Sequence, residues 1–193
     1  MRLIITRHGE TEENRKGITQ GQRHGTLSAL GKNQAKKLAL RLKKEKIDII
    51  YSSDLARAKD TAIHIAKFHQ KAKFKFTKQL RERNLGEFEG RKHSEYIIVR
   101  KDGTWSYPDP KNGESARQLR LRAKRFWQKL LRTHSSGTVL IVAHGGINKM
   151  LLEFLAGENA AIPLKLKNTG VTIIKTGRTG RNKIELVDCT AHL

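Results

Sequence analysis

The chain has 193 residues, and its hydrophobic content of 37% is enough for one sizeable core and too high for a disordered protein. No apolar run approaches the roughly 18 residues that a membrane span needs, and the first apolar stretch, residues 3–5, is too short for a signal peptide. The single cysteine, Cys189, excludes a disulfide within the chain and suits a reducing compartment, so we expect a cytoplasmic protein.

The net charge is unusual at +22, with 40 Lys and Arg residues against 18 Asp and Glu residues. Such a charge predicts attraction to anions, whether phosphorylated metabolites, nucleic acid or a membrane surface. The basic residues are spread along the whole chain rather than gathered in one tail. Solvated helix faces are therefore favoured over a dedicated nucleic-acid site, and non-specific attraction to polyanions follows from the charge alone.

The first elements in chain order are a buried strand at residues 3–6 and a helix at 31–46. In that helix Ala35, Leu38, Ala39 and Leu42 recur at helical spacing, with basic residues on the other face. A second strand follows at 47–53 and a second helix at 55–69. Residues 73–77, "KFKFT", alternate with period two, which predicts a half-exposed strand.

Residues 80–110 are less regular, and a helix resumes at 115–132. Five consecutive apolar residues at 139–143 predict a central strand covered on both faces. A helix at 147–155 and strands at 171–175 and 183–189 complete the chain. Strands that alternate with helices predict one α/β domain over residues 1–193, a three-layer α/β/α arrangement around a mostly parallel sheet, with residues 83–112 as a small lid-like excursion.

Two predicted strand ends carry a histidine, and a third is followed by an arginine one turn into the next helix. Ligands of open parallel sheets sit at the carboxyl ends of the strands, so these side chains should converge on one crevice. Two histidines and two arginines are costly together without an anion, but they suit a phosphate, whose oxygens match the planar donor fork of arginine. A glycine follows each histidine, which predicts a close approach of backbone N–H groups to the phosphate. The converging residues are Arg7, His8, Arg57 and His144.

The motifs that carry these residues resemble those of a known family. They are "TRHGETEEN" at 6–14, "YSSDLARAKDTA" at 51–62, "LRERNLGEFEG" at 80–90, "NGES" at 112–115, "VLIVAHGG" at 139–146 and "KNTGV" at 167–171. In this order and at these spacings they resemble the histidine phosphatase superfamily, also called the phosphoglycerate mutase-like family. A lone "RHG" would be weak evidence, whereas motifs across nearly the whole chain are specific.

The resemblance implies a mechanism. His8 would attack the phosphorus of a monoester and become phosphohistidine, and a backbone carbonyl should hold its neutral ring in the required tautomer. Arg7, Arg57 and His144 would bind the phosphoryl oxygens, and Glu82 would protonate the leaving group and then help to activate water. No metal and no cofactor is implied. The implied substrate-binding residues are Arg7, Asn14, Gln20, Gly21, Arg57, His144 and Gly145.

The segment "GQRHGTLSALG" at 21–31 departs from the family pattern. His24 stands near a position that is commonly acidic, and Thr26 stands where proline is common. In the family this segment borders the mouth of the active site, so the departure concerns the choice of substrate rather than the chemistry.

Phosphatases and mutases of the family differ in the excursion that covers the site, because a mutase must retain its bisphosphate intermediate and exclude water. Residues 83–112 are fewer than mutases usually carry, which favours a phosphatase acting on small phosphorylated metabolites, with a phosphoglycerate mutase as the alternative. Arg91, Lys92 and Arg100 are candidates for a second anionic group of the substrate. A basic nucleic-acid-binding protein is a third reading, weakened because aromatic residues are only 6% and are not interleaved with the basic runs.

Overall fold

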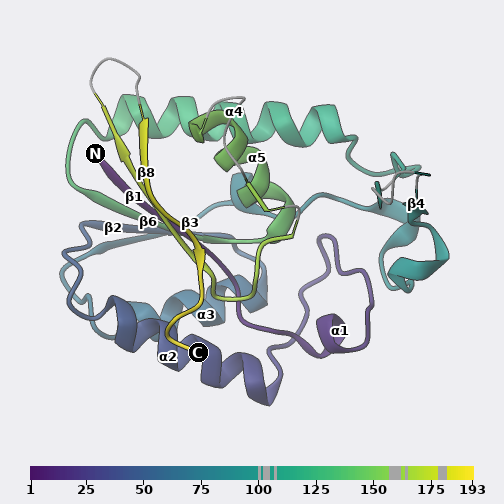
Figure 1. The fold of residues 1–193 in the computed structure, drawn as a ribbon, viewed down its shortest axis with the longest axis horizontal. Helices are drawn as coiled ribbons and strands as arrows, with labels where there is room; N and C mark the ends of the chain where they lie inside the picture. Colours follow the sequence, from purple (N-terminus) through teal and green to yellow (C-terminus); the bar gives the residue numbers. More distant parts are fainter. Residues whose placement is uncertain (100, 102–104, 107, 157–161, 164, 178–181) are drawn as a thin grey trace.

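The fold is a six-stranded sheet between two helical layers (Figure 1). A computed structural model describes residues 1–99, 101, 105–106, 108–156, 162–163, 165–177 and 182–193. The strand order is β3-β2-β6-β1-β7-β8. The strands that pair in parallel are β1 (Arg2–Arg7), β2 (Ile49–Ser52), β3 (Lys73–Phe76) and β6 (Thr138–Ala143). Strand β7 (Val171–Thr176) is antiparallel to both of its neighbours, β1 and β8 (Asn182–Cys189). The predicted mostly parallel sheet is confirmed.

The central strand is β6, which lies between β1 and β2. Its residues from Val139 to Ala143 are at most 1% exposed. Val139 is in register with Leu3 on one side and with Ile49 on the other, so the three strands end at nearly the same level. The prediction of a strand buried on both faces is confirmed, and this shared level is what brings the residues that follow each strand together.

The two helical layers cover opposite faces of this sheet. Helices α2 (Ala29–Leu42) and α3 (Ala56–Ala66) pack against alternate strand residues such as Ile4, Ile50 and Leu140. Helices α4 (Ala116–Thr133) and α5 (Gly145–Ala156) cover the other residues, Leu3 and Ile141 among them. This inward alternation from both faces is expected for strands in the middle of a three-layer domain.

Three details differ from the sequence-based expectations. Helix α2 begins at Ala29, because the hydroxyl of Ser28 caps Gly31 N–H at 3.0 Å, and it ends at Leu42 rather than at residue 46. A short helix, α1 (Glu12–Arg15), was not predicted; the side chains of Thr11 and Asn14 form its capping box. The predicted half-exposure of β3 is wrong, since all four of its side chains are exposed at the sheet edge.

The predicted lid-like segment projects to one side of the sheet (Figure 1). It contains the short 3-10 helices η2 (Gly86–Phe88) and η3 (His93–Glu95) and the two-residue strands β4 (Ile98–Val99) and β5 (Trp105–Ser106). Leu85, Phe88 and Tyr96 form a small core of its own. Arg100 lies outside the described residues. Within the part of the chain that the structure describes, no helix is long and apolar enough to cross a membrane.

Candidate active site

Three of the predicted site residues meet at the carboxyl ends of β1, β2 and β6. Arg57, in the first turn of α3, points its Nε at both histidines, 3.2 Å from His8 Nε2 and 3.1 Å from His144 Nδ1. The centroids of the two imidazole rings are 5.1 Å apart. None of the three residues is more than 2% exposed. The convergence predicted from the strand ends is therefore observed for these three residues.

The hydrogen bonds of His8 determine which ring nitrogen carries its proton. Nδ1 lies 2.7 Å from the carbonyl oxygen of Gly9, which can only accept, so Nδ1 carries the hydrogen. Nε2 then holds the lone pair and accepts from Arg57. The carbonyl required by the mechanism is thus the one that follows His8 directly. Nε2 faces a cation, which is the place where a phosphoryl group would be held.

His144 is held in the opposite tautomer. Its Nδ1 accepts from Arg57 Nε, so the proton is on Nε2, which donates to the hydroxyl oxygen of Ser53 at 2.9 Å. Ser53 follows β2 directly, and its hydroxyl also accepts from Leu55 N–H at 3.2 Å. Sequence reasoning placed Ser53 at a strand end but gave it no role in the site. Its contact orients the imidazole that faces Arg57.

Both histidines are neutral at neutral pH. Burial is the main reason that the pKa values of His8 and His144 lie well below the ordinary value of 6.5, and the neighbouring Arg57 charge lowers both pKa values further. A neutral imidazole keeps the lone pair that nucleophilic attack requires. The environment of His8 therefore favours the reactive form over a wide range of pH.

The guanidinium of Arg57 is fixed by backbone carbonyls rather than by a carboxylate. Its terminal nitrogens donate to the carbonyl oxygens of Gly21 at 2.8 Å, Arg23 at 2.6 Å and His24 at 3.1 Å. Burial lowers the pKa of Arg57 to about 10, so it remains a cation at neutral pH. A buried cation that has carbonyl partners and two neutral histidines in contact attracts an anion strongly.

The loop 166–170, which precedes β7, holds the backbone of Arg7 and His8. Thr169 N–H donates to Arg7 O at 3.1 Å, and the amide of Asn168 donates to His8 O at 2.9 Å. The Arg7 guanidinium donates to Leu166 O at 2.7 Å. Sequence reasoning did not name Asn168 as a site residue, although the "KNTGV" motif that contains it was the available signal.

Gly9 has a different role from the one expected. Its N–H donates to the hydroxyl of Thr61 at 3.1 Å, so the expectation that it faces the phosphate is wrong. A Cβ on Gly9 would lie 2.5 Å from the carbonyl oxygen of Gly31, a contact that real side chains do not make. Gly9 therefore lets the loop after β1 pack against the first turn of α2.

Glu82 reaches the same site from a segment outside the sheet. Its carboxylate lies at the N-terminus of α5, where Oε2 accepts from Gly146 N–H at 2.9 Å and Oε1 accepts from Ile147 N–H at 3.3 Å. The Cβ position of Gly145 is 3.9 Å from Glu82 Oε2 and 3.8 Å from Arg7 Nε. Gly145 therefore lies close to both groups, and a side chain added there would contact the carboxylate and the guanidinium together.

These motifs and this geometry agree with the comparison against protein-family models. Residues 3–189 match the model of the histidine phosphatase superfamily, branch 1. The chain belongs to this superfamily. The resemblance read from the motifs is confirmed.

The most similar relatives of this histidine phosphatase cover nearly its whole length. Phosphoglycerate mutase-like protein 4 of Arabidopsis thaliana is 32% identical over 199 residues, 99% of this chain and 86% of the relative. Putative phosphoserine phosphatase 2 of Hydrogenobacter thermophilus is 34% identical, with 90% and 88% covered. Among solved structures, the phosphoserine phosphatase of Entamoeba histolytica in complex with 3-phosphoglyceric acid has a TM-score of 0.80 at 29% identity, over 99% of this chain and 98% of that one.

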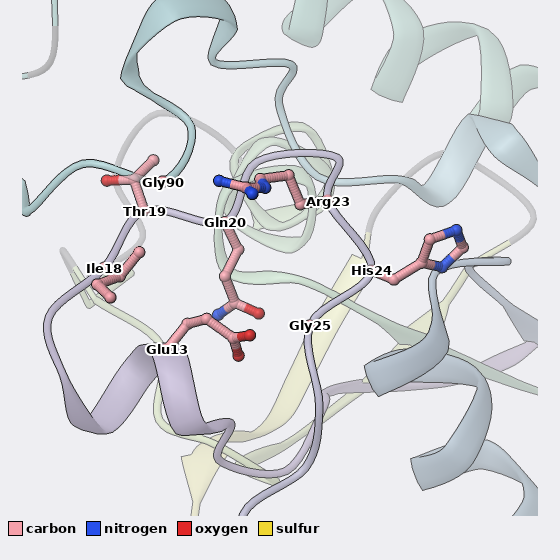
Figure 2. A pocket seen from close by; sticks show the side chains of 8 residues that line it. All are labelled: Glu13, Ile18, Thr19, Gln20, Arg23, His24, Gly25 and Gly90. Atoms are coloured by element: carbon pink, nitrogen blue, oxygen red, sulfur yellow. The ribbon is translucent and has the colours of Figure 1, made fainter.

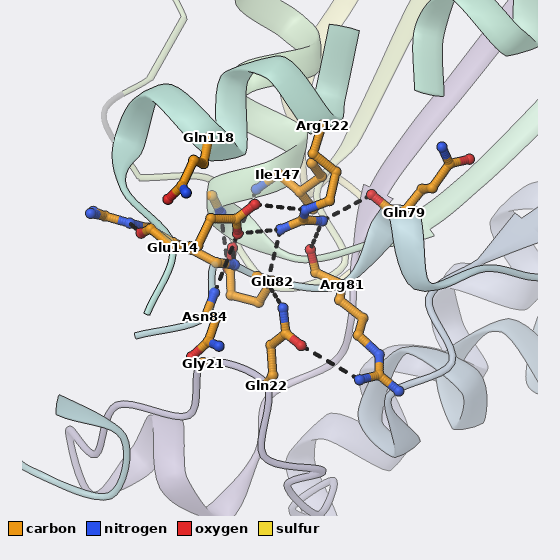
Figure 3. Close-up of polar contacts among 12 residues, drawn as sticks. Gly21, Gln22, Gln79, Arg81, Glu82, Asn84, Glu114, Gln118, Arg122 and Ile147 are labelled. Atoms are coloured by element: carbon orange, nitrogen blue, oxygen red, sulfur yellow. Dashed lines mark hydrogen bonds and ion pairs between the residues drawn. The ribbon is translucent and has the colours of Figure 1, made fainter. Parts of the chain in front are cut away.

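The segment that carries Glu82 in this histidine phosphatase is anchored by Arg122 of α4 (Figure 3). Arg122 donates to the carbonyl oxygens of Gln79 at 2.9 Å, Arg81 at 2.6 Å and Glu82 at 3.1 Å. Its remaining N–H groups make a two-point ion pair with Glu114, at 2.8 and 2.6 Å. One partly buried guanidinium therefore fixes the backbone that leads up to and includes Glu82.

Sequence reasoning missed Arg122 and treated Glu114 only as part of the "NGES" motif. Gln22 adds a further contact, since its amide donates to Glu82 O at 3.2 Å (Figure 3). Nothing in the spacing of Arg122 distinguishes it from the other basic residues of α4, because its partners are carbonyls about 40 residues earlier in the chain.

A cavity of about 330 Å³ adjoins the active site (Figure 2). The side chains of Glu13 and Gln20 point toward each other across it, and Arg23 and His24 line its rim. Because Arg57 donates to the carbonyls of Arg23 and His24, a single guanidinium connects the cavity wall to His8. The cavity is the natural place for the part of a substrate that extends beyond its phosphate.

The other predicted substrate-binding residues lie close to this wall. Gln20 is 7% exposed and lines the cavity, while Gly21 contributes its carbonyl to Arg57 and adopts a positive φ of 50° that favours glycine. The side-chain oxygen of Asn14 accepts from Thr11 N–H and from Asn168, so its amide nitrogen is the atom available to a phosphate.

The candidate second anion site is less well placed. Arg91 pairs with Glu95 at 3.0 Å on the exposed surface.

Across the described residues, no three His, Cys, Asp or Glu side chains are grouped so that they could hold a metal ion.

Proposed function

We propose that this protein is a phosphomonoester hydrolase that acts on small phosphorylated metabolites through a phosphohistidine at His8. The observation that carries the proposal is the state of His8, whose Nδ1–H is held by Gly9 O while Nε2 faces the guanidinium of Arg57. An acceptor-only contact on one nitrogen and a cation before the other prepare the ring for attack on an anionic phosphoryl group. The protein belongs to a superfamily, and relatives in it are named as phosphatases, which supports the same reaction.

In the first step a phosphate oxygen replaces His8 Nε2 as the acceptor of Arg57 Nε–H, which frees the lone pair. A bond forms between His8 Nε2 and phosphorus while the bond from phosphorus to the ester oxygen breaks. Arg7, Arg57 and His144 stabilise the charge on the three phosphoryl oxygens, and protonated Glu82 gives its proton to the leaving alkoxide.

In the second step water attacks phosphohistidine. Glu82, now a carboxylate, takes a proton from the water as the new oxygen–phosphorus bond forms and the bond from phosphorus to nitrogen breaks. Inorganic phosphate leaves and His8 returns as a neutral ring. Glu82 is protonated again at the end, so proton and charge balances close over the cycle.

The cavity beside the site supports substrates that are small. It would hold the alcohol part of the ester. Its lining is mostly polar and suits a polar metabolite, with the side chains of Glu13, Thr19, Gln20, Arg23 and His24 beside the apolar Ile18. Residues 83–112 are proposed as the lid, because Gly90 of this segment lines the cavity and donates its N–H to Thr19 O beside it, while Thr19 N–H donates to Arg91 O. The scarcity of cysteine supports a cytoplasmic location.

The decisive experiment traps the intermediate. The protein is mixed with a phosphomonoester labelled in the phosphate and quenched in base, and we expect label that survives base and is released by acid. His8→Ala should carry no label and should have lost turnover, whereas His64→Ala, a change on α3 outside the site, should behave as the wild type. Label on serine or cysteine, or unchanged turnover of His8→Ala, would overturn the mechanism.

A screen of phosphorylated metabolites then separates the two activities of the family. With 3-phosphoglycerate, a phosphatase releases inorganic phosphate, whereas a mutase yields 2-phosphoglycerate without net release. We expect release. Isomerisation without release would make the mutase alternative the correct one.

A further inference from the structure

The edge strand β3 carries a feature that phosphatase chemistry does not use. Phe74 and Phe76 are 36% and 45% exposed, although their neighbours in register, Ile50 and Ser52, are fully buried. The two rings lie side by side with centroids 4.7 Å apart. Paired exposed aromatics on a soluble domain are uncommon and mark a contact surface.

Lysines lie close to one of these rings and to a third aromatic ring, that of Phe68. Lys59 Nζ lies 5.5 Å from the centroid of the Phe76 ring, and Lys43 Nζ lies 5.4 Å from that of Phe68, which is also exposed. Lys73 and Lys75 alternate with the two phenylalanines along the strand and therefore point to the opposite face of the sheet.

The charge of this region is of one sign. Residues 61–81 contain five lysines and one arginine and no aspartate or glutamate. Lys73 and Lys75 lower the pKa of His134, although burial is the larger cause, so their positive field reaches the neighbouring element. Three acidic residues lie on neighbouring segments. The carboxylate of Asp48 accepts from Thr138 N–H at 2.7 Å, Asp54 pairs with Arg81 at 2.6 Å, and Asp60 follows Lys59 on α3.

We propose that the β3 surface, made of Phe68, Phe74 and Phe76 with Lys43, Lys59, Lys73 and Lys75, binds single-stranded nucleic acid. Exposed rings on a strand offer faces on which unpaired bases stack, and flanking lysines neutralise the phosphates between those bases. Residues two apart on a strand are roughly 6.6 Å apart along it, a spacing that an extended single strand can follow.

This arrangement corrects one expectation and favours one class of partner. The prediction that aromatic residues are not interleaved with basic ones is wrong at β3, where the sequence is Lys-Phe-Lys-Phe and all four side chains are exposed. An acidic peptide would use the lysines but would gain little from the two exposed rings, which are tilted by 50° to each other. A duplex hides its base faces, so it too would use only the lysines.

The experiment measures fluorescence anisotropy of a labelled oligo(dT) 15-mer with the intact protein over a range of salt concentrations. We expect binding that persists at physiological salt, and a blunt duplex of equal length should bind at least about tenfold more weakly. Phe74→Ala/Phe76→Ala should weaken binding of the oligo(dT) by about tenfold or more without changing the salt dependence, because the phosphate contacts remain. Lys73→Gln/Lys75→Gln should instead reduce the salt dependence.

The matched control is Leu121→Ala/Leu131→Ala, which removes two exposed apolar side chains from the basic helix α4 and should bind as the wild type. All variants should keep their melting temperature and phosphatase activity, since none of these residues lies in the active site. Equal binding by the phenylalanine variant would mean that only the net charge acts. Equal binding of duplex, or a stronger phenylalanine-dependent interaction with polyglutamate or with phosphatidylserine vesicles, would also overturn the proposal.

Discussion

The two halves of the active site are built in different ways. His8, Arg57 and His144 stand at or just beyond the carboxyl ends of three adjacent strands, where the backbone is held by the registered central sheet. Glu82 stands on an irregular segment and owes its place to side chains from elsewhere, Arg122 above all. In the proposed mechanism the first half holds the phosphoryl group, and the second supplies the proton for the leaving group.

This difference has a kinetic consequence. Damage to the strand-held half should affect every substrate, because every substrate carries the same phosphoryl group. Damage to the segment-held half should depend on the leaving group, because a good leaving group such as p-nitrophenolate hardly needs an acid. A pair of substrates, p-nitrophenyl phosphate and an alkyl phosphate such as phosphoserine, therefore reports on each half separately.

The largest effect is expected from Arg57→Met, which removes the cation between the two histidines. We expect kcat/KM to fall by about 10³-fold for both substrates, since several donors to the phosphoryl oxygens are lost together. Inorganic phosphate should raise the melting temperature of the wild type but not of this variant. Lys59→Met, a change on the exposed face of the same helix, should leave both properties unchanged. A loss restricted to the alkyl substrate would contradict the assignment of Arg57.

Glu82→Gln should impair only proton donation to the leaving group and leave the phosphoryl-binding half intact. The amide keeps an acceptor for the α5 N–H groups but cannot give a proton to the leaving alkoxide. We expect kcat to fall by about 10²-fold for the alkyl phosphate and by less than tenfold for p-nitrophenyl phosphate. Equal losses on both substrates would remove Glu82 from the role of general acid.

Arg122→Gln should reproduce the pattern of Glu82→Gln at smaller amplitude. Without the guanidinium the backbone of residues 79–82 loses three hydrogen bonds, so the carboxylate is less well placed although its chemistry is intact. We expect about a tenfold fall in kcat for the alkyl phosphate, with little change for p-nitrophenyl phosphate and none in phosphate binding.

The matched control is Arg125→Gln, one turn further along α4 and exposed, which should be silent. Arg122→Lys tests the geometry, because an ammonium cannot make the same forked set of contacts and should rescue the rate only in part. If Arg122→Gln slows both substrates equally, Arg122 acts on overall folding rather than on the position of Glu82.

The same division decides how much could be predicted from sequence. The positions of His8 and His144 follow from apolar runs that end in a polar motif, because parallel strands bring such ends to one edge. The dependence of Glu82 on Arg122 involves a helix 40 residues away and carbonyl acceptors, which leave no trace in the pattern of side chains. The exposure of Phe74 and Phe76 was missed because alternation predicts that one face of a strand is covered, whereas β3 lies at the edge of the sheet and both of its faces are open.

The smallest effect concerns stability against pH. His8 and His144 have pKa values well below 6.5 in the folded protein and near 6.5 in the unfolded chain, so below pH 6.5 the unfolded chain binds protons that the folded protein does not. Stability should be complete above pH 6.5 and should fall as the pH decreases toward the folded pKa values, by about 1 kcal/mol per histidine between pH 6.5 and 5.5. Urea unfolding at pH 7.5, 6.5 and 5.5 measures this slope in the wild type and in His8→Ala. The free energy of unfolding of the variant should depend less steeply on pH, by the contribution of His8 alone, since the other histidines are still present. An unchanged slope would mean that His8 is protonated in the folded protein, and a protonated ring could not be the nucleophile.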